Sequence, residues 1–200
     1  VVPNTKWKLK NIGRGWVLGE TLISGIGQGY FQTTPAQLCL MMAQFANGGY
    51  EVKPRIIDDG INLSSFGLKK LYKNKENIKF VLDALYGATN EPMGTSYRSR
   101  FKKPEYIYAG KTGTSQIRRI TAEERELELK QKDLPYERRD HALFVAFAPY
   151  KQPRYSISVV IEHGGTGSSA AAPIAKKVIK KVLDRHQLRQ KIHWDLYREA

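Results

Sequence analysis

The stretch HALFVAFAPYKQPRYSISVVIEH, residues 141–163, decides which kind of fold this chain adopts. Its two halves, 141–149 and 154–163, are rich in β-branched and aromatic residues, and the turn formers YKQP separate them. Runs of this kind, bounded by Pro and Gly, are typical of strands, and so short a connection joins neighbouring strands in antiparallel order. The sequence therefore predicts a β-hairpin.

A helix is predicted after the hairpin, beyond the flexible turn HGGTGSSAAAP. It runs from about Ala171 to His186, and its apolar residues recur at the spacing of one helical face. We expect this face to cover one side of the sheet, with the lysines of the helix pointing outward. The residues expected to face inward are Ile174, Val178, Ile179 and Val182.

A third strand is predicted ahead of the hairpin, in YAGKTGTSQ, residues 108–116. Successive side chains of a strand point to opposite faces, so Lys111 and Gly113 face one way and Thr112 and Thr114 the other. A long excursion separates this strand from the hairpin. Within it, residues 121–132 indicate a solvated helix with Thr121 and Glu124 as its capping box.

Two helices are predicted in the first half of the chain. The capping pair Thr34 and Gln37 begins one of them, and Gly48 and Gly49 end it. The other covers roughly residues 76–87. The order helix, helix, strand, excursion, strand, strand, helix is an α+β pattern. The expected inner faces are Leu38, Met41, Met42 and Phe45 in the first helix and Ile78, Val81, Leu82 and Leu85 in the second.

The composition fits a globular chain of one-domain size. The chain has 200 residues, of which 41% are hydrophobic and 26% charged, and it lacks a run of about 18 apolar residues that could span a membrane. The net charge of +14 raises the question of an anionic partner, but the lysine clusters are scattered, so we expect solvated basic faces and no nucleic acid. Cys39, the single cysteine, excludes an internal disulfide and is expected to be a small buried hydrophobe.

The succession Lys111, Thr112, Gly113 can form a substrate-facing edge. A lysine ammonium binds a carboxylate, threonine hydroxyls donate to it, and a strand N–H can stabilise an oxyanion. The glycine lets the backbone of a ligand lie close against the strand. A chance K-T-G is expected about 0.09 times in a chain of this composition, so the motif alone leaves a glycine-punctuated turn open.

Five stretches follow one another along the chain: GIGQGYFQTTPAQL, AGKTGTSQ, RDHALFVAFAP, PRYSISVVIEHGG and AAAPIA. Together they resemble the class B penicillin-binding proteins, and most of all the elongation-specific peptidoglycan transpeptidases among them. The likeness runs from about Lys6 to Arg185. The excursion between the second and third stretches fits the same subgroup.

The resemblance implies a D,D-transpeptidase on part of the fold that penicillin-binding proteins share with serine β-lactamases. In that family a serine attacks the D-Ala–D-Ala carbonyl of one stem peptide, and the amine of a second stem then resolves the acyl-enzyme. The matching residues here are Lys111, in a catalytic supporting role, and Lys111, Thr112, Gly113 and Thr114 as substrate-binding residues. The two threonine hydroxyls would hold the substrate carboxylate, and the backbone of Thr114 would contribute to the oxyanion hole.

The resemblance also implies surroundings and partners. It implies an enzyme of the inner membrane whose catalytic domain lies in the periplasm, with an anchoring segment absent from this chain. The implied partners are peptidoglycan stem peptides, β-lactams and the polymerising glycosyltransferase of the elongation machinery. No cofactor is implied, and the spacing of His141, His186 and His193 indicates no metal site.

Two motifs of the family are missing or misplaced. S-x-N does not occur, and the one S-x-x-K, Ser99 to Lys102, lies in a charged loop too close to Lys111 for the family's layout. We therefore interpret Ser99 as a chance match. Residues 1–200 are expected to be the C-terminal portion of one transpeptidase domain whose nucleophile lies upstream of Val1. Such a portion is expected to be inactive and, with an exposed sheet edge, prone to aggregate alone.

Alternatives remain open from the sequence. A serine β-lactamase shares K-T-G and differs by rapid deacylation, and a non-catalytic basic module would bind anionic polymers with a steep salt dependence. His163, beside Gly164 and Gly165, is expected to serve a turn at a strand end rather than to take part in catalysis. Asp140 and His141 are adjacent on a strand, so they are expected to face opposite ways.

Overall fold

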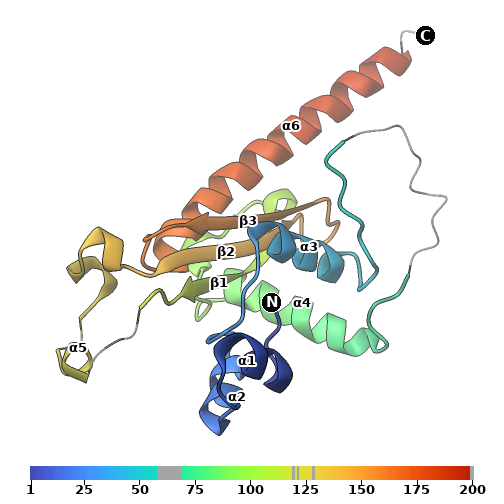
Figure 1. The fold of residues 1–200 in the computed structure, drawn as a ribbon. Helices are drawn as coiled ribbons and strands as arrows, with labels where there is room; N and C mark the ends of the chain where they lie inside the picture. Colours follow the sequence, from blue (N-terminus) through green and yellow to red (C-terminus); the bar gives the residue numbers. More distant parts are fainter. Residues whose placement is uncertain (58–68, 119, 121, 128, 199–200) are drawn as a thin grey trace.

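The computed structural model describes residues 1–57, 69–118, 120, 122–127 and 129–198. Six α-helices and three strands lie along these residues, with short 3₁₀ and π turns between them (Figure 1). The predicted α+β class is confirmed, but the two helices within residues 5–25 were not predicted. None of the helices in the described ranges is both long and apolar enough to cross a membrane. The helices are α1 (Thr5–Ile12), α2 (Leu18–Gly25), α3 (Pro35–Ala46), α4 (Lys75–Asn90), α5 (Ala122–Glu126) and α6 (Ala172–Arg198), and the strands are β1 (Ala109–Ser115), β2 (His141–Ala148) and β3 (Tyr155–Ile161).

The three strands form one antiparallel sheet in the order β1-β2-β3. The hairpin predicted from residues 141–163 is confirmed, with Ala148 opposite Tyr155 beside the turn. Strand β1 pairs with the other side of β2, and Lys111 lies opposite Val145. Since residues directly opposite each other share a face of the sheet, Lys111 and Val145 share one face and Thr112 and Phe144 share the other.

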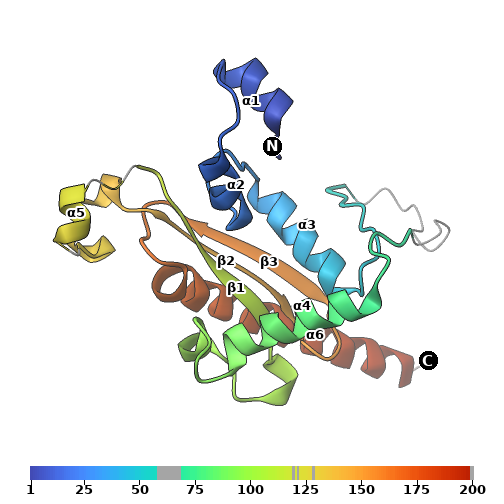
Figure 2. The ribbon, with the colours of Figure 1, turned by 90° about the horizontal axis from the view of Figure 1, so that it is seen from below.

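The face that carries Phe144 is covered by α6, which lies behind the sheet in Figure 2. Small side chains let this helix and the turn before it approach closely, because Ala172 and Ala175 of α6 and Ala171 of the turn are all fully buried. Tyr108 and Phe144 pack edge to face in the same layer, with ring centroids 5.9 Å apart. This layer is the larger part of the hydrophobic core.

The opposite face is covered by α3 and α4, which lie in front of the sheet in Figure 2. Met42 of α3, Leu85 of α4 and Phe147 of β2 are buried together there. The capping box of α3 is present as predicted, with the Thr34 side chain accepting from the Gln37 amide. The sheet is therefore enclosed between helices on both faces.

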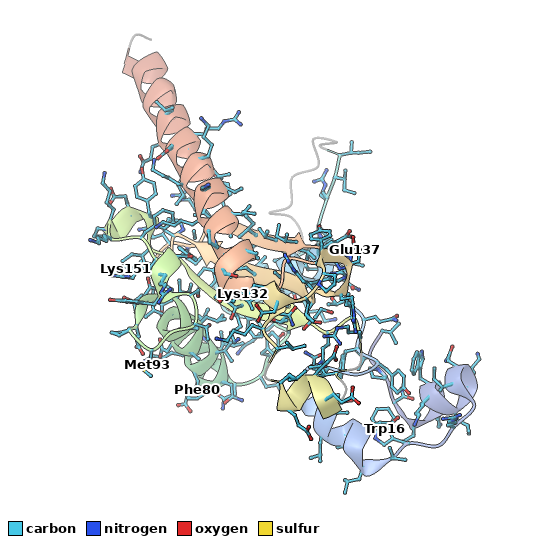
Figure 3. The ribbon with its side chains drawn as sticks, turned by 90° about the vertical axis from the view of Figure 1, so that its left-hand side faces the viewer. Trp16, Phe80, Met93, Lys132, Glu137 and Lys151 are labelled. Atoms are coloured by element: carbon cyan, nitrogen blue, oxygen red, sulfur yellow. The ribbon has the colours of Figure 1, made fainter. Side chains whose placement is uncertain are left out.

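Helices α1 and α2 stand apart from the sheet (Figures 1 and 2). The Lys8 ammonium, although buried, forms an ion pair with Glu20 and donates 2.6 Å to the carbonyl of Gly15, which joins the two helices. The hydrogen bond from Lys8 is the main reason that the pKa of the Glu20 carboxyl lies below its ordinary value. Trp16, labelled in Figure 3 at this end of the molecule, donates 2.9 Å to the Thr21 hydroxyl.

The final helix differs from its prediction in two ways. It continues to Arg198, well past the sheet (Figure 1), and its inner face is not the predicted one. Ile174 and Val178 are 41% and 43% exposed, Ile179 is buried as predicted, and Val182 is half-buried. The face toward the sheet also contains Ala175 and Leu183. Ile174 precedes Ala175 directly and is therefore about 100° around the helix from the buried face.

Three further expectations need correction. The helix expected at 121–132 is only the short α5, followed by a 3₁₀ turn at Gln131–Asp133, and Thr121 of its capping box lies outside the described residues. Glu124 forms ion pairs with Arg118 and Arg138 at 2.5 and 3.1 Å. Met41 is 36% exposed rather than buried. Cys39 is half-buried rather than buried, and its Sγ lies 3.1 Å from the Ser156 hydroxyl.

Candidate active site

The outer edge of β1 is partly closed by the C-terminal end of α4. The buried Thr89 hydroxyl accepts from the amide of Gly110 at 3.0 Å and lies 3.2 Å from the carbonyl oxygen of the same residue. Asn90 donates 2.9 Å to the carbonyl of Tyr108. These contacts fix the first residues of the strand and end before Lys111.

Beyond Gly110 the same edge is open. Alternate residues of a strand direct their backbone groups to the same edge, so the N–H and C=O groups of Thr112 and Thr114 point the same way as those of Gly110. Two of these acceptors are occupied by side chains: the Lys111 ammonium donates 2.8 Å to the carbonyl of Thr112, and Gln28 donates 3.1 Å to that of Thr114. No acceptor from the described residues meets the two amide N–H groups, so a ligand can use them.

Gln28 belongs to the glycine-rich segment GIGQG that leads from α2 toward α3. The hydrogen bond from Gln28 to Thr114 holds this segment opposite β1. The segment and the strand together enclose a cavity of about 800 Å³. The side of the cavity near α4 contains Thr95, whose hydroxyl lies 3.0 Å from the hydroxyl of Thr112. The K-T-G-T residues Lys111, Thr112, Gly113 and Thr114 all line this cavity.

A third side of the cavity comes from the turn before α6. Thr166, Gly167 and Ser168 line it, and Gly167 lies directly over the backbones of β1 and β2. A Cβ atom on Gly167 would stand 2.2 Å from the carbonyl oxygen of Leu143 and 2.7 Å from that of Gly113. Glycine is therefore required at position 167 for this turn to close against the strand.

The cavity is suited to an anion. Lys111 lines it and, in the described part of the chain, no Asp or Glu does. Hydroxyl groups of Thr95, Thr112 and Thr114 supply further donors beside the ammonium. An ammonium with several hydroxyls and two strand N–H groups can bind the carboxylate of a peptide whose backbone lies along the strand.

The structure brings the predicted site residues together and keeps Ser99 away from them. Ser99 is buried in the 3₁₀ turn Tyr97–Ser99, and its carbonyl accepts from the Tyr108 hydroxyl at 3.0 Å. Burial of that hydroxyl raises the pKa of Tyr108. Ser99 is absent from the cavity lining, which agrees with its interpretation as a chance match.

The histidine and aspartate predictions are consistent with the geometry. His163 has a positive φ of 53°, and its amide donates 3.0 Å to the ring of His141, so it serves the turn after β3. Asp140 accepts from Gln131 at 2.8 Å instead of meeting His141. None of these residues lines the large cavity.

Sequence reasoning missed Thr95, Gln28 and Gly167 as parts of the site. Gln28 and Thr114 are 86 positions apart, so no local pattern joins them. Thr95 lies in a loop whose composition indicates only turns. The glycine-rich spacing of GIGQG was the one available signal, because such segments let backbones approach each other closely.

A sheet enclosed by helices, with K-T-G-T on the open edge of a strand, is typical of the fold that penicillin-binding proteins share with serine β-lactamases. Residues 3–180 match the family model of the "Penicillin binding protein transpeptidase domain", and the chain belongs to this family.

Named relatives place the chain within the family. It is 32% identical over 195 residues to the peptidoglycan D,D-transpeptidase MrdA of Salmonella typhimurium, with 92% of this chain and 30% of that protein covered. It is 34% identical to MrdA of Haemophilus influenzae, with 92% and 29% covered. The chain therefore spans less than a third of the length of these relatives.

Solved structures agree with the sequence relatives. The penicillin-binding protein PBP2 of Helicobacter pylori, in its complex with MreC, superposes with a TM-score of 0.76 at 31% identity, covering 92% of this chain and 31% of that one. PBP2 of Pseudomonas aeruginosa superposes with a TM-score of 0.71 at 33% identity, covering 90% and 37%. These similarities confirm the prediction that the chain is related to the elongation-type, class B penicillin-binding proteins.

Proposed function

We propose that the protein carrying this chain is a serine-type peptidoglycan D,D-transpeptidase of the PBP2 type, and that β-lactams acylate it. The observation that carries the proposal is the open edge of β1. There the N–H groups of Thr112 and Thr114 and the Lys111 ammonium line one cavity without a carboxylate from the described residues. A peptide ending in a carboxylate can bind there as an added strand.

The proposed reaction proceeds in two steps. A serine Oγ forms a bond to the penultimate D-Ala carbonyl carbon, the peptide C–N bond breaks, and D-alanine leaves with the proton. The amine of a second stem peptide then attacks the acyl carbon, and the serine regains its proton as the cross-link forms. The oxyanion of each tetrahedral intermediate would accept from the Thr114 amide, a contact worth about 2.7–4 kcal/mol in comparable sites.

In this proposal the chain supplies the substrate-binding strand, and the nucleophile lies outside residues 1–200. Support comes from the absence of S-x-N in the sequence and from the position of Ser99 away from the cavity. The 200 residues would then be the C-terminal portion of one transpeptidase domain. We propose that they are inactive without the remainder.

The relatives support a proposal about location and partners. We propose that the catalytic domain works in the periplasm of a bacterium whose inner membrane anchors the whole protein. The related H. pylori PBP2 forms a complex with MreC, which supports an assignment to the cell wall elongation machinery. Within that machinery the proposed partner is the glycosyltransferase that polymerises the glycan strands.

The test is acylation of the complete protein by a fluorescent penicillin, followed by mapping of the labelled serine. We expect the label on a serine that is not Ser99. Lys111→Ala is expected to slow labelling by at least about tenfold, since a charge-assisted contact is worth 1.5–3 kcal/mol. Lys102→Ala, at the end of the chance S-x-x-K match, is the control and is expected to label normally.

Other outcomes identify the alternatives. A label on Ser99, or normal labelling of Lys111→Ala, would contradict the proposed site. Rapid loss of the label would indicate a β-lactamase, because β-lactamases deacylate quickly. Absence of labelling combined with steeply salt-dependent binding to anionic polymers would favour a non-catalytic basic module.

A further inference from the structure

The loop that follows α4 places a threonine, Thr95, beside the K-T-G-T strand. Met93, labelled in Figure 3, belongs to the same loop. The hydroxyl oxygen of Thr95 lies 3.0 Å from that of Thr112, and both residues line the large cavity. In the described part of the chain, neither hydroxyl has a further hydrogen-bond partner. The remaining hydrogen-bonding capacity of this pair is therefore free for a ligand.

The loop that carries Thr95 is fixed to the last turns of α4. The amide and the hydroxyl of the buried Ser96 both donate 3.0 Å to the carbonyl of Ala88. On the other side of Thr95, a Cβ atom on Gly94 would stand 2.5 Å from the carbonyl oxygen of Gly87, so the loop lies directly against the helix. Both chain neighbours of Thr95 are thus held by α4.

The same part of α4 also holds the strand. Thr89, the residue after Ala88, hydrogen-bonds to the amide and the carbonyl of Gly110. Thr112 follows Gly110 by two positions in β1. Helix α4 therefore fixes the loop with Thr95 and the strand with Thr112 relative to each other. A pair that is already in place before the ligand arrives loses little conformational freedom when the ligand binds.

The direction of the hydrogen bond between the two threonines depends on what is bound beside them. A hydroxyl has one proton to donate and two lone pairs that accept. Without a ligand, either oxygen can be the donor. A carboxylate only accepts, so a carboxylate bound at Thr112 requires the proton of that hydroxyl, and Thr95 must then donate to Thr112. Hydrogen bonds in such a chain polarise and strengthen one another.

We propose that Thr95 is a positioning residue of the candidate active site. Its hydroxyl donates to the Thr112 oxygen and directs the Thr112 proton toward the terminal carboxylate of a stem peptide, or toward the carboxylate of a β-lactam. The inference rests on the proposed function, since it assumes a carboxylate at Thr112. Thr95 acts on the substrate only through Thr112, so its effect should disappear when the Thr112 hydroxyl is removed.

The test is a double-mutant cycle on the complete protein, with the second-order rate constant of penicillin acylation as the measured quantity. Thr95→Val keeps the shape of the side chain and is expected to slow acylation about threefold to tenfold. Thr112→Val is expected to slow it at least about tenfold, because the bond it removes is charge-assisted. In the Thr112→Val background, Thr95→Val is expected to change the rate by less than about twofold.

Two further variants are the controls. Thr95→Ser keeps the hydroxyl and is expected to react within about twofold of the parent rate. Thr5→Val makes the same substitution at an exposed threonine of α1, away from the cavity, and is expected to react at the parent rate. Since valine at position 95 could also disturb the loop, the serine variant separates the loss of the hydroxyl from a change in packing.

Three results would overturn the inference while leaving the proposed function intact. They are a Thr95→Val protein that reacts at the parent rate, an equal slowing by Thr95→Val in both backgrounds, and a Thr95→Ser protein as slow as Thr95→Val. An equal slowing in both backgrounds would show that Thr95 only supports the loop. Absence of penicillin labelling in the parent protein would contradict the proposed function, and the inference with it.

Discussion

The side-chain amide of Gln28 donates a hydrogen bond of 3.1 Å to the carbonyl oxygen of Thr114. This bond ties the segment between α2 and α3 to the last part of β1. It also occupies one of the backbone acceptors on the open edge of the strand. The shape of the candidate active site therefore depends on a contact between residues far apart in sequence.

Replacing Gln28 by Ala is expected to loosen the GIGQG segment without unfolding the protein. The lost hydrogen bond is exposed, so the free energy of unfolding should fall by no more than about 1 kcal/mol. Hydrogen exchange of the Gly27 and Gln28 amides should become faster, while that of β2 stays unchanged. Gln152→Ala, at an exposed turn, is the control, and equal exchange in both variants would contradict the assigned contact.

Replacing Thr89 by Val is expected to destabilise the protein by about 1–3 kcal/mol, because it leaves the buried Gly110 amide without a partner. Valine has nearly the same shape, so the loss reports on the hydroxyl. The measurement is unfolding by denaturant, with the exposed Thr33→Val as control. Equal stability of the two variants would show that α4 does not fix β1 through this hydroxyl.

Replacing Gly167 by Ala is expected to cost about 1–3 kcal/mol of stability, since its Cβ would meet backbone oxygens that cannot move easily. The matched change is Gly19→Ala in α2, where nothing lies within 4 Å of the added atom. There alanine should stabilise by about 0.4–1 kcal/mol. The stabilities of both variants are measured by thermal unfolding. A Gly167→Ala variant as stable as the parent protein would contradict the close contact between this turn and the strand.

The Asp184 carboxyl near the middle of α6 gives an expected pH dependence. Hydrogen bonds from Lys180 and then Tyr106 lower the pKa of Asp184 below its ordinary 3.8. A lowered pKa means that the contribution to stability is present above the ordinary value and is lost as the pH falls through the folded-state value. Asp184→Asn should thus lower the melting temperature at about pH 6 and converge with the parent in acid.

The exposed carboxyl of Glu137, labelled in Figure 3, supplies the control for this experiment. Glu137→Gln should melt like the parent protein over the same range of pH. A difference between Asp184→Asn and the parent that persists unchanged in acid would contradict the assigned hydrogen bonds.

The sheet was predicted well from the sequence, because each strand has a recognisable pattern of neighbouring residues. β-branched runs and short turns determine the hairpin, and K-T-G-T lies on β1 as expected. The inner face of α6 was predicted poorly, since Ala172 and Ala175 are buried by the closeness of the sheet and not by their hydrophobicity. Periodicity of large apolar residues therefore pointed to Ile174 and Val178, which lie to one side.

The part of the candidate site on β1 could likewise be predicted from neighbouring residues in the sequence. Lys111 to Thr114 form one continuous motif, and their common edge follows from the geometry of a strand. Gln28, Thr95 and Gly167 reach the cavity from three separate segments, which follow α2, follow α4 and precede α6. Apart from the glycine-rich spacing of GIGQG, the sequence gives no local signal that these distant segments meet.

The open edge of β1 has a consequence for the evolution of drug resistance. Its N–H groups belong to the main chain, so no point mutation can delete them while the strand persists, proline aside. In a protein that binds β-lactams as proposed, a mutation that weakens these main-chain contacts must then tilt or shift the strand. Thr89, Gln28 and Gly167 are the contacts that hold it in place, and we expect adaptive changes to gather around them.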